Sequence, residues 1–161
     1  MKRRSLSASE FEALLPRLRV FLGDVNVKKV LKRGVDAVEL EDVMVLSVAG
    51  FFFVVGNEWV VPALVDVNKP LIDRLASVWV DMGAVPRVAS GADVMRPGIV
   101  RMDVFQAGDE VVVRDITHSK PLAVGQALMS SEKASALAKG KVVKNLHHID
   151  DAAWKALKQV L

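Results

Sequence analysis

Cysteine is absent from the 161-residue chain, so the protein has no disulfide framework and no thiolate for catalysis or metal binding. This absence is more common in intracellular proteins than in secreted ones. The chain also has no GxGxxG motif and no P-loop, the usual glycine-rich signatures of nucleotide binding. These absences exclude several common enzyme classes and favour a non-catalytic function.

A long hydrophobic run is also missing. The longest apolar stretch, residues 43–55, is interrupted by Ser47 and Gly50. It is shorter than the roughly 20 residues that a bilayer-spanning helix needs. The basic residues 2–4 are not followed by an apolar segment, so we expect no signal peptide. The sequence therefore predicts a cytoplasmic protein that does not span a membrane.

The chain does contain enough apolar residues for a core. Apolar residues make up 52% of it and charged residues 25%, which is typical of a globular protein and not of a disordered one. The net charge is only +3, but it is unevenly distributed. Residues 1–33 carry nine Lys/Arg against three Asp/Glu, residues 34–86 two against eight, and residues 87–161 eleven against eight. Such a pattern of basic and acidic segments can steer polyanions.

Residues 1–74 are predicted to form a mixed α/β domain. Ser7 and Glu10 have the spacing of a capping box, and apolar residues then recur at helical spacing up to Gly23. After a short basic helix the hydrophobic period changes to two, which indicates strands. The expected elements are helices at 11–22 and 27–32, strands at 43–48, 51–55 and 59–61, and a short helix opened by Pro62.

Residues 75–161 are predicted to form a second domain, joined to the first near residues 70–78. We expect Gly91 to end a helix over residues 84–90. Arg96 is expected to be extended because Pro97 follows it, and Pro97-Gly98 fits the central positions of a type II turn. Further strands are expected at 111–116, 122–129 and 142–147, with helices at 130–138 and 150–160.

A histidine pair near the C-terminus could be taken for a metal site. His147 and His148 are adjacent on a predicted strand, so their rings point to opposite faces and cannot chelate one ion together. Asp150 and Asp151 follow, and no third soft ligand is present. A strand end followed by an aspartate N-cap explains the motif better than a metal centre does. We expect no metal and no cofactor.

A catalytic triad could be drawn from Asp115, His118 and Ser119. These residues are neighbours in the sequence, and no strained nucleophile elbow accompanies them. We therefore expect the protein not to be an enzyme.

The most distinctive stretch is GADVMRPGIVRM, residues 91–102. One interpretation is structural: a helix cap and a turn in a β-barrel. The other is functional: the Arg-Pro-Gly corner directs Arg96, Arg101 and the nearby Arg87 toward one surface. Arginines held on a rigid corner contact phosphates with little ordering cost.

Several segments, in this order, resemble the PUA domain, a fold named after pseudouridine synthases and archaeosine transglycosylases. They are VDMGA at 80–84, SGADVMRPGI at 90–99 and GDEV at 108–111. The continuation is similar to the malignant T-cell-amplified-sequence family and its archaeal relatives. It consists of AVG at 123–125, KGK at 139–141 and NLHHIDD at 145–151, with Trp154 after them.

The resemblance implies an α+β protein. Its N-terminal mixed α/β pre-PUA domain, residues 1–74, would be followed by the PUA domain, residues 75–161, a small mixed β-barrel with short helices. The resemblance also implies an RNA-binding surface. Its residues would be Gly91, Ala92, Asp93, Met95, Arg96, Pro97 and Gly98, with Arg87 and Arg101 beside them and Ala127, Leu128 and Met129 on the neighbouring strand.

The resemblance also implies a place in translation, because eukaryotic relatives act on the small ribosomal subunit with a partner protein. We expect a non-catalytic protein that binds tRNA or ribosomal RNA by shape and phosphates. The small ribosomal subunit or a translation factor would then be its partner. One alternative is an accessory subunit that presents RNA to a modifying enzyme. Another is a protein-interaction module whose acidic middle segment is the docking face.

Overall fold

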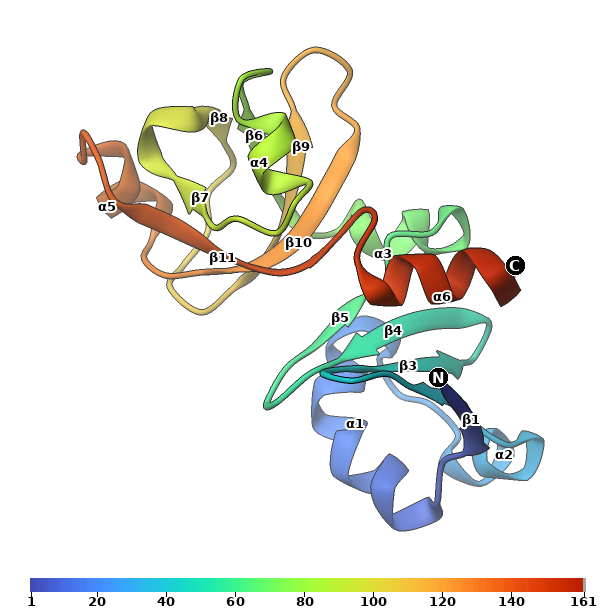
Figure 1. The fold of residues 1–161 in the computed structure, drawn as a ribbon. Coiled ribbons are helices and arrows are strands. Elements are labelled where there is room, and N and C mark those ends of the chain that lie inside the picture. The colour runs from blue at the N-terminus through green and yellow to red at the C-terminus, as the bar shows by residue number, and fades with distance from the viewer. Residues whose placement is uncertain (161) are drawn as a thin grey trace.

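The structure is a computed structural model that describes residues 1–160. It contains two β-sheets, one from each half of the chain, and the C-terminal helix lies against both (Figure 1). Helices and strands are mixed in both halves, which confirms the predicted fold class.

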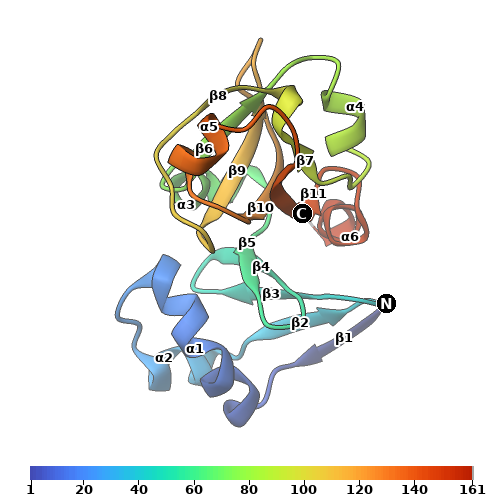
Figure 2. The ribbon, with the colours of Figure 1, turned by 90° about the vertical axis from the view of Figure 1, so that its left-hand side faces the viewer.

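The first sheet is antiparallel and has its strands in sequence order. The helices α1 and α2 cover one of its faces (Figures 1 and 2). The predicted capping box is confirmed, because Ser7 Oγ accepts a hydrogen bond from the Glu10 amide and the Glu10 carboxylate accepts one from the Ser7 amide. The elements are β1 (Lys2–Ser5), α1 (Ala8–Leu22), α2 (Val27–Arg33), β2 (Asp36–Glu39), β3 (Met44–Val48), β4 (Phe51–Val55) and β5 (Val60–Pro62).

The helix expected after Pro62 is wrong. Pro62 is the last residue of the edge strand β5, a position that tolerates the missing amide hydrogen. The buried Asn68 side chain fixes the chain that follows: its amide donates to the carbonyls of Phe52 and Ala63, and its oxygen accepts from the Phe52 amide. The 3-10 helix η1 (Asp66–Asn68) and the short helix α3 (Lys69–Ile72) then lead to the second sheet.

The second sheet has the strand order β7-β11-β10-β9-β6-β8. Strands β6 and β9 are parallel and the other pairs are antiparallel. Two of the helices, α4 and α5, are shorter than the sequence predicted. The elements are β6 (Ala76–Val80), α4 (Val85–Val88), β7 (Val94–Met95), the 3-10 turn η2 (Arg96–Gly98), β8 (Ile99–Met102), β9 (Glu110–Asp115), β10 (Pro121–Ala127), α5 (Ser131–Ser135), β11 (Lys141–His148) and α6 (Ala152–Val160).

The Arg-Pro-Gly corner joins the two edge strands of this sheet, β7 and β8, and so nearly closes it into a barrel. The Arg96 amide donates to the Gly140 carbonyl at 2.8 Å, and the Asp81 amide donates to the Gly98 carbonyl at 2.9 Å. The corner is a 3-10 turn in which Gly98 does not have a positive φ. The expected type II turn, and the extended conformation expected for Arg96, are therefore wrong.

Two separate cores and a shared one hold these layers together. One core fills the barrel, and another lies between α1 and the first sheet. The third combines Val45 and Val54 of the first sheet with Val112, Val124 and Leu157 of the second half. Helix α6 lies next to the first sheet in both ribbon views (Figures 1 and 2). Its buried face therefore connects the two halves.

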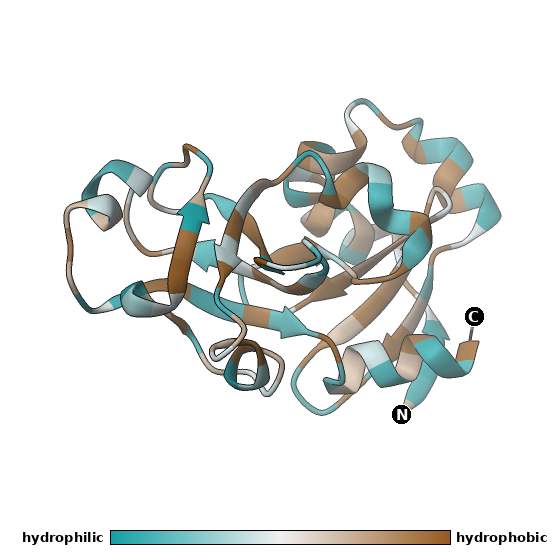
Figure 3. Cartoon of the chain, turned by 90° about the horizontal axis from the view of Figure 1, so that it is seen from above, coloured by the Kyte–Doolittle hydropathy of each residue, from teal (hydrophilic) through white to brown (hydrophobic). Residues whose placement is uncertain are grey.

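Figure 3 shows brown hydrophobic segments along the central strands, with hydrophilic teal segments more frequent in the helices and loops at the periphery. Within residues 1–160, no helix is both long enough and apolar enough to cross a membrane.

Candidate nucleic-acid interface

The segment between α4 and β7 is held in one conformation by its own backbone. The Gly91 amide donates to the Val88 carbonyl at 3.0 Å, and the Ala92 amide donates to the Arg87 carbonyl at 3.0 Å. This pair of bonds is a Schellman motif, in which Gly91 has a φ of +100°. The expected helix-ending role of Gly91 is therefore confirmed.

Strand β11 fixes the same segment from the other side. The Asn145 side-chain amide donates to the carbonyls of Val88 and Ala92, both at 3.0 Å. The Asn145 backbone amide donates to Asp93 Oδ1 at 2.9 Å, and Lys141 Nζ lies 3.3 Å from Asp93 Oδ2. Asp93, expected to contact RNA, thus holds two residues of β11. Asn145 belongs to a stretch that carries the resemblance, but its anchoring role could not be found from sequence spacing.

His148 packs directly against this segment. A Cβ atom at position 91 would lie 3.0 Å from His148 Nε2, so the ring would have to shift by a few tenths of an ångström to admit a larger residue. The other ring nitrogen, Nδ1, is 2.7 Å from the Ile149 carbonyl and donates to it. Glycine is therefore favoured at position 91 mainly by its positive φ, and the tight approach of His148 adds to this preference.

The two arginines of the corner lie against different elements. Arg96 Nε donates to the Ala134 carbonyl of α5 at 2.8 Å, and Arg96 Nη1 donates to the Ile99 carbonyl at 3.2 Å. Arg101 instead lies over the Trp79 ring of β6, 3.9 Å from its centroid. The expectation that the corner directs both arginines to one surface needs correction, because Arg96 braces α5 against the corner.

The other expected site residues differ in exposure. The Ala127 side chain belongs to the barrel core, and Met129 is half-buried against that core. By contrast, Met95 and Leu128 are 42% and 46% exposed, and they flank β11 on its two sides. Exposed apolar side chains mark a binding site where they form a contiguous patch. Of the other expected residues, Arg87, Ala92, Pro97 and Arg101 are exposed, and Gly91, Asp93, Arg96 and Gly98 are partly buried.

Three lysines that were not among the expected site residues lie on β11 or just before it. Lys139, Lys141 and Lys144 are exposed, and Lys139 precedes the glycine whose carbonyl accepts from the corner. Of these three lysines only Lys141 forms an ion pair within residues 1–160. We refer to the exposed side chains of Arg87, Ala92, Met95, Pro97, Leu128, Lys139, Lys141 and Lys144 as the α4–β7 surface.

The histidine pair has the structural role expected from the sequence. His147 is buried, and its Nε2 accepts a hydrogen bond from the Leu64 amide at 3.0 Å. Its Nδ1 donates to Asp151 Oδ2 at 2.7 Å, while Asp151 Oδ1 accepts from the Trp154 amide and caps α6. Burial tends to raise the pKa of Asp151, but the hydrogen bonds from His147 and the backbone outweigh burial and leave this pKa below its usual value.

The residues of the apparent triad form a turn. Asp115 accepts hydrogen bonds from the backbone amides of His118 and Lys120, and Ser119 Oγ accepts one from the Trp79 indole. Burial tends to raise the pKa of Asp115, but these backbone amides lower it further than burial raises it. No hydrogen bond joins the Ser119 hydroxyl to the His118 ring in the described part of the chain, and residues 1–160 contain no cluster of three potential metal ligands.

The six-stranded, nearly closed barrel identifies the class of protein to which the chain belongs. Residues 76–149 match the PUA domain. A hypothetical protein from Pyrococcus horikoshii has the same fold with a TM-score of 0.70 and 30% identity, over 96% of this chain and 99% of that one.

The relatives extend beyond the barrel. An uncharacterized protein of Methanocaldococcus jannaschii is 35% identical over 155 residues, which are 95% of each chain. Translation machinery-associated protein 20 of Saccharomyces cerevisiae is 29% identical over 133 residues, 76% of this chain and 72% of the yeast protein. Human malignant T-cell-amplified sequence 2 is 33% identical over 79 residues, 47% of this chain and 44% of the human protein. The chain belongs to this family of PUA-domain proteins, which confirms the resemblance seen in the sequence.

Proposed function

We propose that this is a non-catalytic, cytoplasmic RNA-binding protein of translation, and that it binds tRNA or ribosomal RNA through the α4–β7 surface. The observation that carries the proposal is the combination, on the α4–β7 segment and the strands next to it in a PUA barrel, of a rigid backbone, exposed apolar side chains and lysines. The name of the yeast relative supports the link to translation. The small ribosomal subunit or a translation factor is the partner that this proposal implies.

The surface suits RNA for two reasons. Lys139, Lys144 and Arg87 form no ion pair within residues 1–160, so their charges are available to phosphates. Met95 and Leu128 offer apolar contacts to sugars and unstacked bases beside those charges. Because the backbone of the segment is already fixed, binding would order little of the protein.

The proposal excludes catalysis. The relatives are named for their association with translation or for their amplification, and none of those names describes an enzyme. The apparent triad of Asp115, His118 and Ser119 serves a turn. We therefore propose binding, and no catalytic step, as the chemistry of the surface.

A salt titration of RNA binding tests the proposal. We expect Lys139→Ala/Lys144→Ala to weaken binding of bulk tRNA and of a ribosomal RNA fragment, and to reduce the salt slope by roughly 2 for two lost phosphate contacts. The matched control is Lys28→Ala/Lys32→Ala, which removes the same charge from α2 and should leave the slope within error of the unchanged protein. Equal slopes for both double variants would place RNA binding elsewhere.

A further inference from the structure

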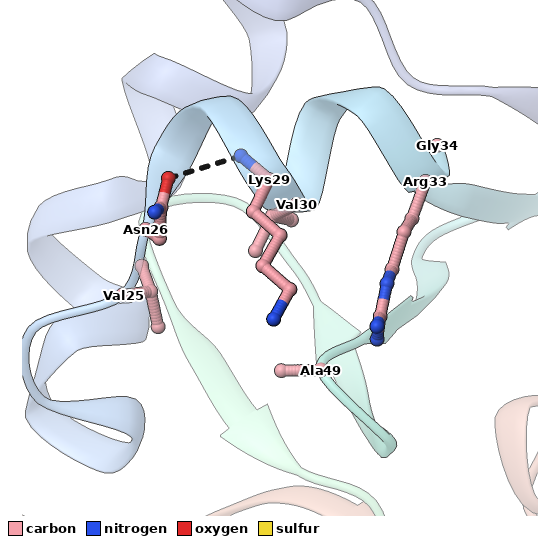
Figure 4. A pocket seen from close by; sticks show the side chains of 7 residues that line it. All are labelled: Val25, Asn26, Lys29, Val30, Arg33, Gly34 and Ala49. Carbon is pink, nitrogen blue, oxygen red and sulfur yellow. Dashed lines mark hydrogen bonds between the residues drawn. The ribbon is translucent and has the colours of Figure 1, made fainter.

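A concave site lies in the N-terminal half, far in sequence from the α4–β7 surface. Figure 4 shows it between α2 and the turn that joins β3 to β4. Its volume is about 260 Å³. That volume is below the roughly 300–1,000 Å³ of typical cofactor and drug-sized sites, so it suits one or two side chains. The lining residues are Val25, Asn26, Lys29, Val30, Arg33, Gly34 and Ala49.

The floor of this groove is apolar and its rim is rigid. Val25, Val30 and the Ala49 methyl group face the hollow (Figure 4). Ala49 and Gly50 have φ values of +53° and +85°, which fix the turn between two paired strands. At the opposite side, Asn26 Oδ1 accepts from the Lys29 amide at 3.0 Å and caps α2. An apolar side chain could therefore enter a site that is already formed.

Two cations border the same hollow. Lys29 and Arg33 are one helical turn apart, both are exposed, and neither forms an ion pair within residues 1–160. Residues advance by about 100° each around a helix, so this pair lies on the flank beside Val30. Lys28 and Lys32 lie about 160° around the helix from Val30 and do not line the groove. The groove thus combines an apolar floor with two uncompensated positive charges.

We propose that this groove docks a short acidic segment of a partner protein, with one apolar side chain on the floor and carboxylates at Lys29 and Arg33. The two positive charges favour an acidic partner, because opposite charges attract across an interface. The apolar floor favours a peptide, because a peptide can supply an apolar side chain to cover it. An RNA backbone would reach the two cations but would leave Val25, Val30 and Ala49 uncovered. This site is independent of RNA binding by the α4–β7 surface.

The test uses the 161-residue protein and a labelled peptide, acetyl-Glu-Glu-Leu-Leu-Glu-Glu-amide. Fluorescence anisotropy and backbone amide NMR measure the binding. We expect peptide-induced shifts at residues 25–34 and 49–50 and none in residues 87–98. Lys29→Glu/Arg33→Glu should weaken the peptide roughly tenfold or more. Lys28→Glu/Lys32→Glu makes the same charge change on the same helix and should stay within about threefold of the unchanged protein.

A second variant covers the case in which Lys29→Glu/Arg33→Glu fails to fold. Ala49→Asp leaves α2 intact, and aspartate tolerates the left-handed backbone at this position. Its carboxylate would lie near the two cations and compete with the peptide, so binding should fall by a similar factor.

Control probes separate the sources of binding. Replacing both leucines of the peptide by serine should abolish binding, and undiminished binding would show ion attraction alone and overturn the proposal. Unchanged amide shifts in the groove at peptide concentrations up to the millimolar range would also overturn it. Competition by RNA would also contradict the proposal. If bulk tRNA displaces the peptide, and Lys29→Glu/Arg33→Glu weakens tRNA binding by the same factor as peptide binding, the groove is a phosphate contact.

Discussion

At the level of single residues, Arg96 stabilises the fold by connecting the corner to α5. Its contribution to the free energy of unfolding can be measured without RNA. Its guanidinium donates to the Ala134 and Ile99 carbonyls, whereas Arg101 makes only an exposed contact with Trp79 among described residues. Hydrogen bonds from a charged donor contribute about 1.5–3 kcal/mol each, and an exposed cation–π contact about 0.5–1 kcal/mol. The neighbouring arginines should therefore differ in their effect on stability.

We expect Arg96→Ala to lower the free energy of unfolding by roughly 2 kcal/mol or more, because both hydrogen bonds of the charged guanidinium are lost. This corresponds to a fall in melting temperature of about 4–8 °C for a chain of this length. Arg101→Ala should cost less than about 1 kcal/mol. Thermal and urea unfolding measure both, and a larger loss for Arg101→Ala than for Arg96→Ala would contradict the assigned roles.

Glu110, the first residue of β9, makes stability depend on pH. Burial raises the pKa of its carboxyl from the ordinary 4.5 to about 7. As the pH rises from 4.5 to 7, the unfolded chain loses this proton while the folded chain keeps it, so folding becomes less favourable. Above pH 7 both states are ionised and the full cost of the buried charge remains.

Glu110→Gln should therefore stabilise the protein at pH 8, by roughly 1 kcal/mol because the carboxyl keeps some contact with water. The gain should shrink as the pH falls through 7 and vanish near pH 4. Melting curves of the two proteins at pH 4, 6 and 8 measure it. A Gln variant that is no more stable than the unchanged protein at pH 8 would show that this carboxylate is well solvated.

At the element scale, the close pairing of β10 with β11 depends on Gly125. The strand register shifts between Val124 and Gly125, and a Cβ at position 125 would lie 2.4 Å from the Lys144 carbonyl oxygen and 2.5 Å from Val143 Cγ1. Backbone cannot move away cheaply at such a distance. Strand β11 anchors the α4–β7 segment through Asn145, so a disturbance here would also reach the candidate interface.

We expect Gly125→Ala to lower the free energy of unfolding by at least about 2 kcal/mol. Gly83→Ala is the matched control, because its Cβ would meet only Asp81 Oδ1 at 3.3 Å and Gly83 has no positive φ. Gly83→Ala should lower the free energy of unfolding by less than about 1 kcal/mol. Urea unfolding compares them, and equal effects would argue against close strand contact at Gly125.

Some elements could be predicted from the sequence because their hydrophobic periods are strong. Helix α1 and the strands β3 and β4 have clear periods, and each forms where it was expected. Strand β1 has the sequence KRRS and gives no alternating signal. It is an edge strand held by backbone pairing with β2 and by ion pairs of Arg4 with Glu10 and Glu39. Such tertiary causes are not visible in a local pattern.

The candidate interface was predictable only in part for the same reason. The helix cap at Gly91 follows from the local sequence, and it forms where expected. The brace of Arg96 depends on Ala134, which is 38 positions away. The type II turn failed because the corner must connect two opposite edge strands, a requirement that neither proline nor glycine encodes.

At the scale of the whole molecule, we propose that residues 1–74 and 75–161 are two domains coupled by a shared core. The barrel core lies entirely within the second part, but Val112, Val124 and Leu157 pack with Val45 and Val54 of the first. The buried hydrogen bond from the Leu64 amide to His147 crosses the same junction. Each part has its own core, and α6 depends on both.

We expect a fragment of residues 75–161 to keep its barrel and to lose α6. Amide hydrogens of β9 and β10 should exchange slowly because their pairing partners all remain. Those of α6 should exchange fast, since the helix loses the first sheet on which its buried face packs. Hydrogen exchange measures both, and a fragment that exchanges fast throughout would contradict the division at residue 74.

The central claim is that the α4–β7 surface of the barrel binds RNA in the cell. Ultraviolet crosslinking in cells, followed by sequencing of the bound RNA and mass spectrometry of the crosslinked peptides, tests it most directly. We expect tRNA or ribosomal RNA attached to peptides from residues 87–98 and 126–144. No crosslinked RNA, or RNA attached only to peptides from residues 1–74, would contradict it.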